Sequence, residues 1–219
     1  AAGGETSPLF LLADGMGGAR GGRDASRLAL ATAARAFAAT PPGQPLDRAL
    51  DAAFQAANAA VHQKARDDPA LAGMGTTLVA LACREGRGVA ANVGDSRLYL
   101  LRWGELRQIS RDHGLVAEQV RQGRLSPEEA RHHALRNVLT RALGVAPELE
   151  VDLFPLTLRA GDLFLLCSDG LHGPVEETAL AGVLAGPGAP AAKAARLVEL
   201  ANQAGGPDNV SVVLVAVET

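Results

Sequence analysis

Two kinds of hydrophobic pattern alternate along the chain, and they predict where strands and helices lie. Short continuous apolar runs are typical of buried β-strands, whereas apolar residues three and four positions apart are typical of one face of an α-helix. Continuous runs predict strands over residues 9–13, 76–83, 88–94, 97–102, 150–157, 162–167 and 209–217. Helical spacing predicts helices over residues 23–38, 46–61, 113–135, 175–185 and 190–203.

Turn-forming residues mark the ends of several of these segments. The stretch PPGQP at 41–45 separates the first two helices, and WGEL at 103–106 predicts a hairpin turn. Within residues 113–135, Ser126 followed by Pro127 predicts a new helix start, because serine is a good N-cap and proline fits the first helical turn. Short turns between the strands of the middle region indicate antiparallel pairing.

The order of the elements predicts the fold class. Strands follow one another in blocks and helices come in pairs, without the regular strand–helix alternation of a doubly wound parallel sheet. We therefore expect an α+β fold in which helix pairs cover antiparallel sheets. No repeat or low-complexity linker divides the sequence, so residues 1–219 are predicted to form one domain.

Composition and charge indicate the class of protein and the partners that it is expected to have. Hydrophobic residues make up 47% of the 219 residues, which is enough for a sizeable core. No apolar run approaches the ~20 residues that span a bilayer, and we expect no signal peptide, because the N-terminus has no basic and apolar regions of that kind. The net charge of -3, with both signs interspersed, argues against nucleic acid as a partner. Cys83 and Cys167 lie in apolar runs, which predicts buried thiols in a reducing cytoplasm.

Three aspartates share a position at the ends of predicted buried strands. Asp14 ends LFLLA, Asp169 follows LFLLCS, and Asp208 precedes NVSVVLV. Each one alone is explained about as well by a turn or a helix cap. Together they favour a cation, because carboxylates removed from water without nearby arginines are costly unless a positive charge pairs with them. Oxygen ligands select Mg²⁺ or Mn²⁺ rather than zinc.

A series of motifs extends this interpretation from a metal site to a family. In chain order they are LFLLADGMGGARGG, GMGTTLVAL, VAANVGDSRLYLLR, ISRDH, RNVLTRALG, GDLFLLCSDGL and GGPDNVSVVLV. Together they resemble the metal-dependent type-2C protein phosphatases, the PPM family, in their bacterial form, from Leu9 to Val217. The resemblance implies a four-layer α-β-β-α sandwich of two antiparallel sheets flanked by helix pairs. It also implies hydrolysis of phosphoserine and phosphothreonine, with two Mn²⁺ or Mg²⁺ ions and attack by a metal-bridging hydroxide.

The resemblance also assigns roles to individual residues. Asp14 is expected to bridge both metals, and the main-chain carbonyl of Gly15 is expected to bind one of them. Asp169 and Asp208 complete the metal ligands, so the three aspartates are the expected catalytic residues, acting through the metals. Asp112 in RDHG matches the family's ligand for a third, weaker metal.

The resemblance implies partners as well. Residues 114–136 correspond to the flap, a segment beside the active site that helps to choose substrates. The expected partners are phosphorylated proteins and an opposing serine/threonine kinase, and we expect a monomer in the cytoplasm, without nucleic acid and without a membrane span. A phosphatase of a sigma-factor cascade, acting on an anti-sigma antagonist, fits the same motifs.

The chain departs from the family pattern near the predicted phosphate site. The family's first strand, which carries a phosphate-binding arginine, is apparently lacking, because only 13 residues precede Asp14 and none is an arginine. Arg20 is a candidate substitute for contact with the substrate, and His172 is a second candidate because it follows Asp169 closely. Gly173 stands where the family commonly has a second aspartate, which predicts weak binding of the third metal.

These departures leave an alternative function open. Glu5 is the only acidic residue before Asp14, and we do not expect it to bind metal. A catalytically impaired domain of the same fold would bind phosphoproteins or regulate a partner instead of hydrolysing phosphate esters.

Overall fold

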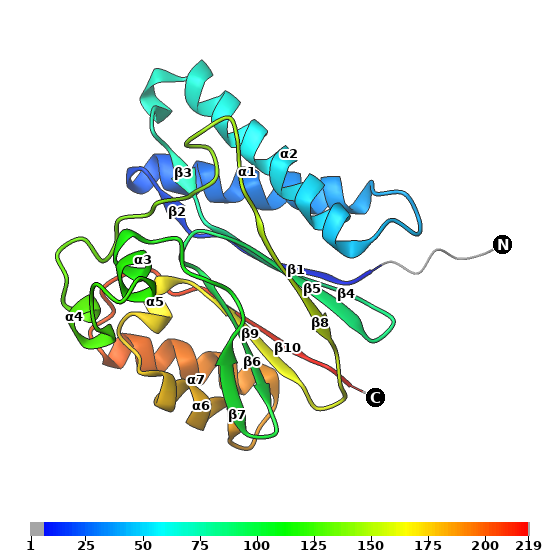
Figure 1. Ribbon diagram of the computed structural model, residues 1–219, viewed down its shortest axis with the longest axis vertical. Helices are drawn as coiled ribbons and strands as arrows, with labels where there is room; N and C mark the ends of the chain where they lie inside the picture. Colours follow the sequence, from blue (N-terminus) through cyan, green and yellow to red (C-terminus); the bar gives the residue numbers. More distant parts are fainter. Residues whose placement is uncertain (1–6, 219) are drawn as a thin grey trace.

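Two antiparallel sheets lie face to face at the centre of the computed structural model, which describes residues 7–218 (Figure 1). The first sheet has the spatial order β1 (Leu9–Leu12), β4 (Leu78–Arg84), β5 (Arg87–Val93) and β8 (Asp152–Thr157). The second has the order β10 (Val212–Ala216), β9 (Leu163–Cys167), β6 (Arg97–Arg102) and β7 (Glu105–Gln108). A separate two-stranded ribbon pairs β2 (Gly15–Met16) with β3 (Gly75–Thr76).

Helix pairs cover the two outer faces. The long helices α1 (Gly18–Ala38) and α2 (Leu46–Asp67) lie over the first sheet, and α6 (Glu177–Ala185) and α7 (Pro190–Gln203) lie over the second (Figure 1). Shorter helical segments are η1 (Pro69–Leu71), α3 (Leu115–Arg121), α4 (Pro127–Arg131) and α5 (Asp169–His172). The predicted four-layer α-β-β-α sandwich is therefore confirmed.

Three hydrophobic cores hold the layers together, one between each pair of neighbouring layers. Strand β9 shows how one sequence serves two of them. Leu163, Leu165 and Cys167 pack toward α6 and α7, whereas Phe164 and Leu166 face the other sheet. Because successive side chains of a strand point to opposite faces, a strand buried on both sides reads as a continuous apolar run.

Most of the predicted elements are present, with one clear correction. The helix predicted over 113–135 is two short helices, α3 and α4, with a turn between them. The N-cap prediction is confirmed: Ser126 Oγ accepts the Glu129 N–H at 3.2 Å, and the Glu129 carboxylate accepts the Ser126 N–H at 2.8 Å. A capping box of this kind fixes the start of a helix, which interrupts the longer helix that the spacing alone predicted.

Three further expectations concern membrane-spanning helices, the cysteines and the edge of the first sheet. No helix in the part that the structure describes has the length and apolar character needed to cross a bilayer. Both cysteines are free thiols, Cys167 buried and Cys83 partly exposed. Within residues 7–218, β1 is an edge strand of its sheet. The prediction that the family's first strand is lacking concerns the chain before residue 7, outside the described residues.

Candidate metal centre

Asp14 is fixed in space by hydrogen bonds to its own main chain. It lies between β1 and β2, where the chain leaves the first sheet. The Asp14 N–H donates to Thr77 Oγ1 at 2.9 Å, and the Asp14 carbonyl accepts from Thr77 N and from Thr76 Oγ1, both at 2.8 Å. Because the main chain of Asp14 is bound on both sides, its carboxyl group is held at the end of the strand.

Asp169 is brought to the same end of the sandwich by the second sheet. It is the first residue of α5, directly after β9, and the antiparallel partner strand β10 is preceded by the loop that carries Asp208. The chain before Asp169 is joined to the chain after Asp208 by a hydrogen bond from Ser211 N to Ser168 Oγ at 3.1 Å.

A glycine allows these two segments to come close. A Cβ atom on Gly170 would lie 2.1 Å from the carbonyl oxygen of Asn209, so no larger residue fits there without movement of the main chain. This close approach places Asp169 beside Asp208, although the two are far apart in the sequence.

The carboxyl groups of Asp14 and Asp169 form a close pair. Burial, the charge of Asp169 and a hydrogen bond with it raise the pKa of Asp14 from 3.8 to about 7. Burial is also the main reason why the pKa of Asp169 is raised. The Asp208 charge contributes to both shifts, so its carboxylate lies near the pair, but Asp208 itself is exposed.

The pair fits a divalent cation. Asp169 Oδ1 is buried and has no hydrogen-bond partner among the described residues, so this carboxylate oxygen is available to bind a cation. Within residues 7–218 no three acidic, histidine or cysteine side chains are gathered into a complete ligand set. The paired Asp14 and Asp169 are therefore the preformed part of the site, and exposed Asp208 stands at its rim.

Asp95 belongs to this acidic group as well. It lies in the turn between β5 and β6, which connects the two sheets. Burial, followed by the charges of Asp169 and Asp112, raises its pKa to about 7. The signal was present in the sequence, because Asp95 follows a buried strand and a glycine just as the other acids follow or precede strands.

Asp112 occupies a different environment from the close pair. Arg97 donates to both of its carboxylate oxygens at 2.7–3.0 Å, and Gln108 Nε2 donates to Oδ1 at 2.8 Å. The side chains of Arg97 and Gln108 therefore both bind this carboxylate. Both of its oxygens are engaged by a bidentate ion pair, so a third cation at Asp112 would compete with Arg97.

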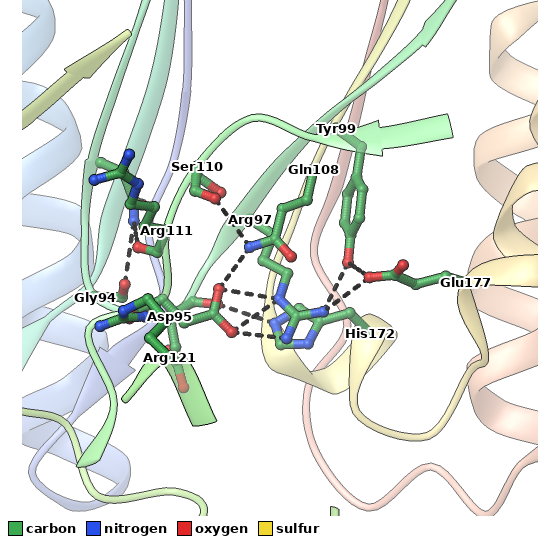
Figure 2. A network of polar contacts seen from close by, with 12 residues as sticks. Gly94, Asp95, Arg97, Tyr99, Gln108, Ser110, Arg111, Arg121, His172 and Glu177 are labelled. Atoms are coloured by element: carbon green, nitrogen blue, oxygen red, sulfur yellow. Dashed lines mark hydrogen bonds and ion pairs between the residues drawn. The ribbon is translucent and has the colours of Figure 1, made fainter. Parts of the chain in front are cut away.

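The two substrate-contact candidates differ in what the structure shows of them. His172 Nε2 lies 3.0 Å from the carbonyl oxygen of Asp95 (Figure 2). Burial lowers the pKa of His172 to about 3, so the ring is neutral and Nε2 carries the hydrogen that it donates to this carbonyl. His172 is therefore engaged within the protein. Arg20 lies in α1, and its side chain is outside the described part of the structure, as is the whole of Glu5.

Gly15 lies where the chain passes closest to the start of α1. It pairs with Thr76 in the β2–β3 ribbon, and its carbonyl oxygen would be 2.5 Å from a Cβ atom placed on Gly22. The glycines that follow Asp14 therefore let two main-chain segments approach each other beside the carboxyl pair.

The segment predicted to be the flap, 114–136, is attached mainly by polar contacts. Arg121 Nη1 donates to the Asp112 carbonyl at 2.9 Å, and Arg131 pairs with Glu176 at the start of α6. Within the described residues, α4 has no buried side chain. Few apolar contacts hold this segment, which favours local movement beside the acidic group.

Comparisons with known proteins agree with this geometry. The family model for protein phosphatase 2C matches residues 2–202. The serine/threonine protein phosphatase PstP of Mycobacterium tuberculosis is 46% identical over 206 residues, covering 94% of this chain and 40% of the relative, so the chain spans about two fifths of that protein. The serine/threonine phosphatase stp of Listeria welshimeri is 40% identical, with 96% of this chain and 85% of the relative covered.

One similar solved structure contains metal ions. The crystal structure of the catalytic domain of PstP in complex with two manganese ions has a TM-score of 0.88 and 42% identity to this chain, covering 100% of this chain and 94% of that one. The order of the motifs, the four-layer sandwich and the match over most of its length show that this chain belongs to the protein phosphatase 2C family.

Proposed function

We propose that this chain hydrolyses phosphoserine and phosphothreonine in proteins, in a reaction that requires two Mn²⁺ or Mg²⁺ ions. The observation that carries the proposal is the Asp14–Asp169 pair, with one buried carboxylate oxygen that has no partner in the described residues. Two relatives named as serine/threonine phosphatases align with nearly the whole chain, which supports the same activity.

Four groups of the chain would hold the two cations. Asp14 is proposed to contact both, with the Gly15 carbonyl on one of them and Asp169 and Asp208 completing the set. When bound, the cations lower the pKa of water, so that hydroxide is available near neutral pH, and they offset the negative charge of the phosphate. A third cation, if bound, would be held by Asp95 rather than by Asp112, because the carboxylate of Asp112 is already engaged.

The side chains prepare the site by their charge state. Without metal, the raised pKa of Asp14 lets the pair hold one proton near neutral pH, which limits the repulsion between the two carboxylates. Metal binding to carboxylates releases such a proton, so the affinity of the site increases with pH through this range. The main-chain hydrogen bonds of Asp14 keep its carboxyl group in place through this exchange.

Substrate selection is assigned to the flap and to the surface around the acids. Residues 114–136 lie beside Asp112 and carry several exposed arginines, which suits a substrate with negative charges. Arg20 stays a candidate for contact with the phosphate. Because His172 donates its Nε2 hydrogen to Asp95, we do not carry it forward as a substrate contact.

The alternative of a catalytically impaired, phosphoprotein-binding domain is not supported. The acids at the ends of the strands are all present, and the relatives that match are named as phosphatases. We propose an opposing serine/threonine kinase as the functional partner. The free thiols of Cys83 and Cys167 support a reducing compartment such as the cytoplasm.

Hydrolysis of a phosphothreonine peptide and of a small aryl phosphate tests the proposal. We expect activity with Mn²⁺, loss of activity after chelation and recovery when Mn²⁺ is returned. Asp14→Asn and Asp169→Asn should reduce kcat at least 100-fold, since each removes a proposed metal ligand. Activity that persists in a chelator, or in both variants, would refute the two-metal mechanism. Absence of hydrolysis with Mn²⁺ bound would restore the binding-domain alternative.

A further inference from the structure

Buried hydroxyl groups connect the main chain of Asp14 to the turn that joins the two sheets. Thr77 Oγ1 accepts the Asp14 N–H at 2.9 Å and lies 2.7 Å from Ser96 Oγ. Ser96 is fully buried and Thr77 is nearly so, with 3% of its surface exposed. A hydroxyl can accept one hydrogen bond and donate another, so Thr77 links Asp14 to Ser96 in one continuous chain.

The contact between Thr77 and this turn is built into the main chain. Gly94, which begins the turn, has a left-handed φ of 102°, and a Cβ atom there would lie 2.6 Å from Thr77 Cγ2. A glycine is therefore needed at this position for two reasons, the backbone angle and the space taken by Thr77. The turn and Thr77 are fitted to each other, so their hydrogen bond is not a chance surface contact.

The same turn is attached on its other side to the segment that carries Asp169. His172 Nε2 donates to the Asp95 carbonyl at 3.0 Å, and His172 is the last residue of the short helix that Asp169 begins (Figure 2). The turn thus lies between the two metal-binding segments. Thr77 and Ser96 attach it to Asp14, and His172 attaches it to the helix of Asp169.

We propose that Thr77 and Ser96 are positioning residues that hold Asp14 opposite Asp169 and so set the affinity of the site for divalent cations. This inference rests on the proposed function, because it concerns the same metal site. The hydroxyls do not touch the cations; they act through the main chain of Asp14. Groups that orient metal ligands from behind typically change metal affinity by about 10–100-fold when removed.

Calorimetric titration of Mn²⁺ into the chelator-treated chain tests the proposal without using catalysis as the readout. Thr77→Val keeps the shape of the side chain but removes the hydroxyl, and we expect Mn²⁺ affinity to fall at least tenfold. Thr77→Ser keeps the hydroxyl, and its affinity should stay within about threefold of the original. Ser96→Ala leaves the Thr77–Asp14 bond in place and should give an intermediate loss.

Thr32 offers a matched control. Its buried Oγ1 has no hydrogen-bond partner among the described residues, so Thr32→Val removes a buried hydroxyl that positions no metal ligand. We expect its Mn²⁺ affinity to be unchanged. If Thr77→Val does not fold, as judged by circular dichroism, Ser96→Ala and Thr77→Ser carry the test alone.

The outcomes separate the two proposals. Equal Mn²⁺ affinity in the original chain, Thr77→Val and Ser96→Ala overturns the positioning role and leaves the metal site intact. The same holds if Thr77→Ser loses as much affinity as Thr77→Val, because the hydroxyl would then not be the cause. An original chain that binds no Mn²⁺ overturns both the metal site and the inference that rests on it.

Discussion

Replacing Asp14 by asparagine should stabilise the metal-free protein and destabilise the metal-loaded one. In the folded protein, burial and the neighbouring acids raise the pKa of Asp14 to about 7 from its ordinary 3.8. Each tenfold change in an ionisation equilibrium is worth about 1.4 kcal/mol, so keeping Asp14 charged in the fold costs at most about 4 kcal/mol. The side chain retains some access to water, which screens this repulsion, and we expect Asp14→Asn to recover about 1–2 kcal/mol at pH 8.

The sign of the pH dependence follows from the same shift. The folded protein binds the proton of Asp14 more tightly than the unfolded chain does. The contribution of Asp14 to the free energy of unfolding is therefore most favourable at low pH. It falls as pH rises from about 4 to about 7 and is then constant. In the Asp14→Asn variant this part of the slope should be absent. Urea unfolding in EDTA at a series of pH values measures both effects.

Addition of Mn²⁺ should reverse the order of the two proteins. At a cation concentration 100 times its Kd, the original chain gains about 2.7 kcal/mol, whereas the variant gains much less. Asp67→Asn, at an exposed position of α2, is the control and should change stability by less than about 0.5 kcal/mol in either buffer. If Asp14→Asn is less stable than the original chain in EDTA at pH 8, the carboxyl pair is not repulsive and the reasoning fails.

Two further predictions concern packing and charge. Gly170→Ala should destabilise the fold by several kcal/mol and weaken Mn²⁺ binding, because its Cβ would lie 2.1 Å from a carbonyl oxygen. Gly182→Ala is the control, since there is open space around this position of α6, and it should stabilise the fold by about 0.4–1 kcal/mol. Urea unfolding measures the stability of both variants. Burial by itself would raise the pKa of Asp162, whose side chain is 1% exposed, but hydrogen bonds from Arg102 and from the Arg159 N–H, together with the charges of both arginines, lower it. Arg102→Met should therefore cost about 2–4 kcal/mol at pH 7, and less as acid protonates Asp162. The exposed pair of Arg196 is the control, and an equal loss in Arg196→Met would contradict the argument.

The sequence predicted the acids at the strand ends because apolar runs and the glycine or turn residues beside them are local features of the sequence. Asp14 and Asp169 each follow an apolar run that the structure shows as a strand, and Asp208 precedes another. Continuous apolar runs also predicted that these strands are buried, since strands covered on both sides are apolar throughout. The family motifs then supplied the order of the layers, which periodicity alone does not determine.

What the sequence did not predict depends on contacts between distant segments. Asp95 resembles any turn aspartate until the structure shows that its turn joins the two sheets beside Asp169. Asp112 matched a motif, yet its carboxylate is engaged by Arg97, which lies 15 residues earlier on β6. Such pairings are set by sheet register and side-chain direction, and these carry no signature in the local pattern of residues.

The site also shows why a fold would retain an arrangement that destabilises it. Carboxyl groups that repel one another are brought together by main-chain contacts that do not involve the carboxyl groups themselves, through Thr77 behind Asp14 and through Gly170 behind Asp169. The two cores outside the sheets and the one between them supply the stability that opposes this repulsion. A cation that enters such a site relieves the repulsion between Asp14 and Asp169 without having to bring these two ligands together, so no binding free energy is needed to order them. The repulsion that lowers the free energy of unfolding of the metal-free protein is thus the same repulsion that a bound cation relieves. Variants that let the two carboxyl groups move apart should therefore raise the stability of the metal-free protein and lower its affinity for cations.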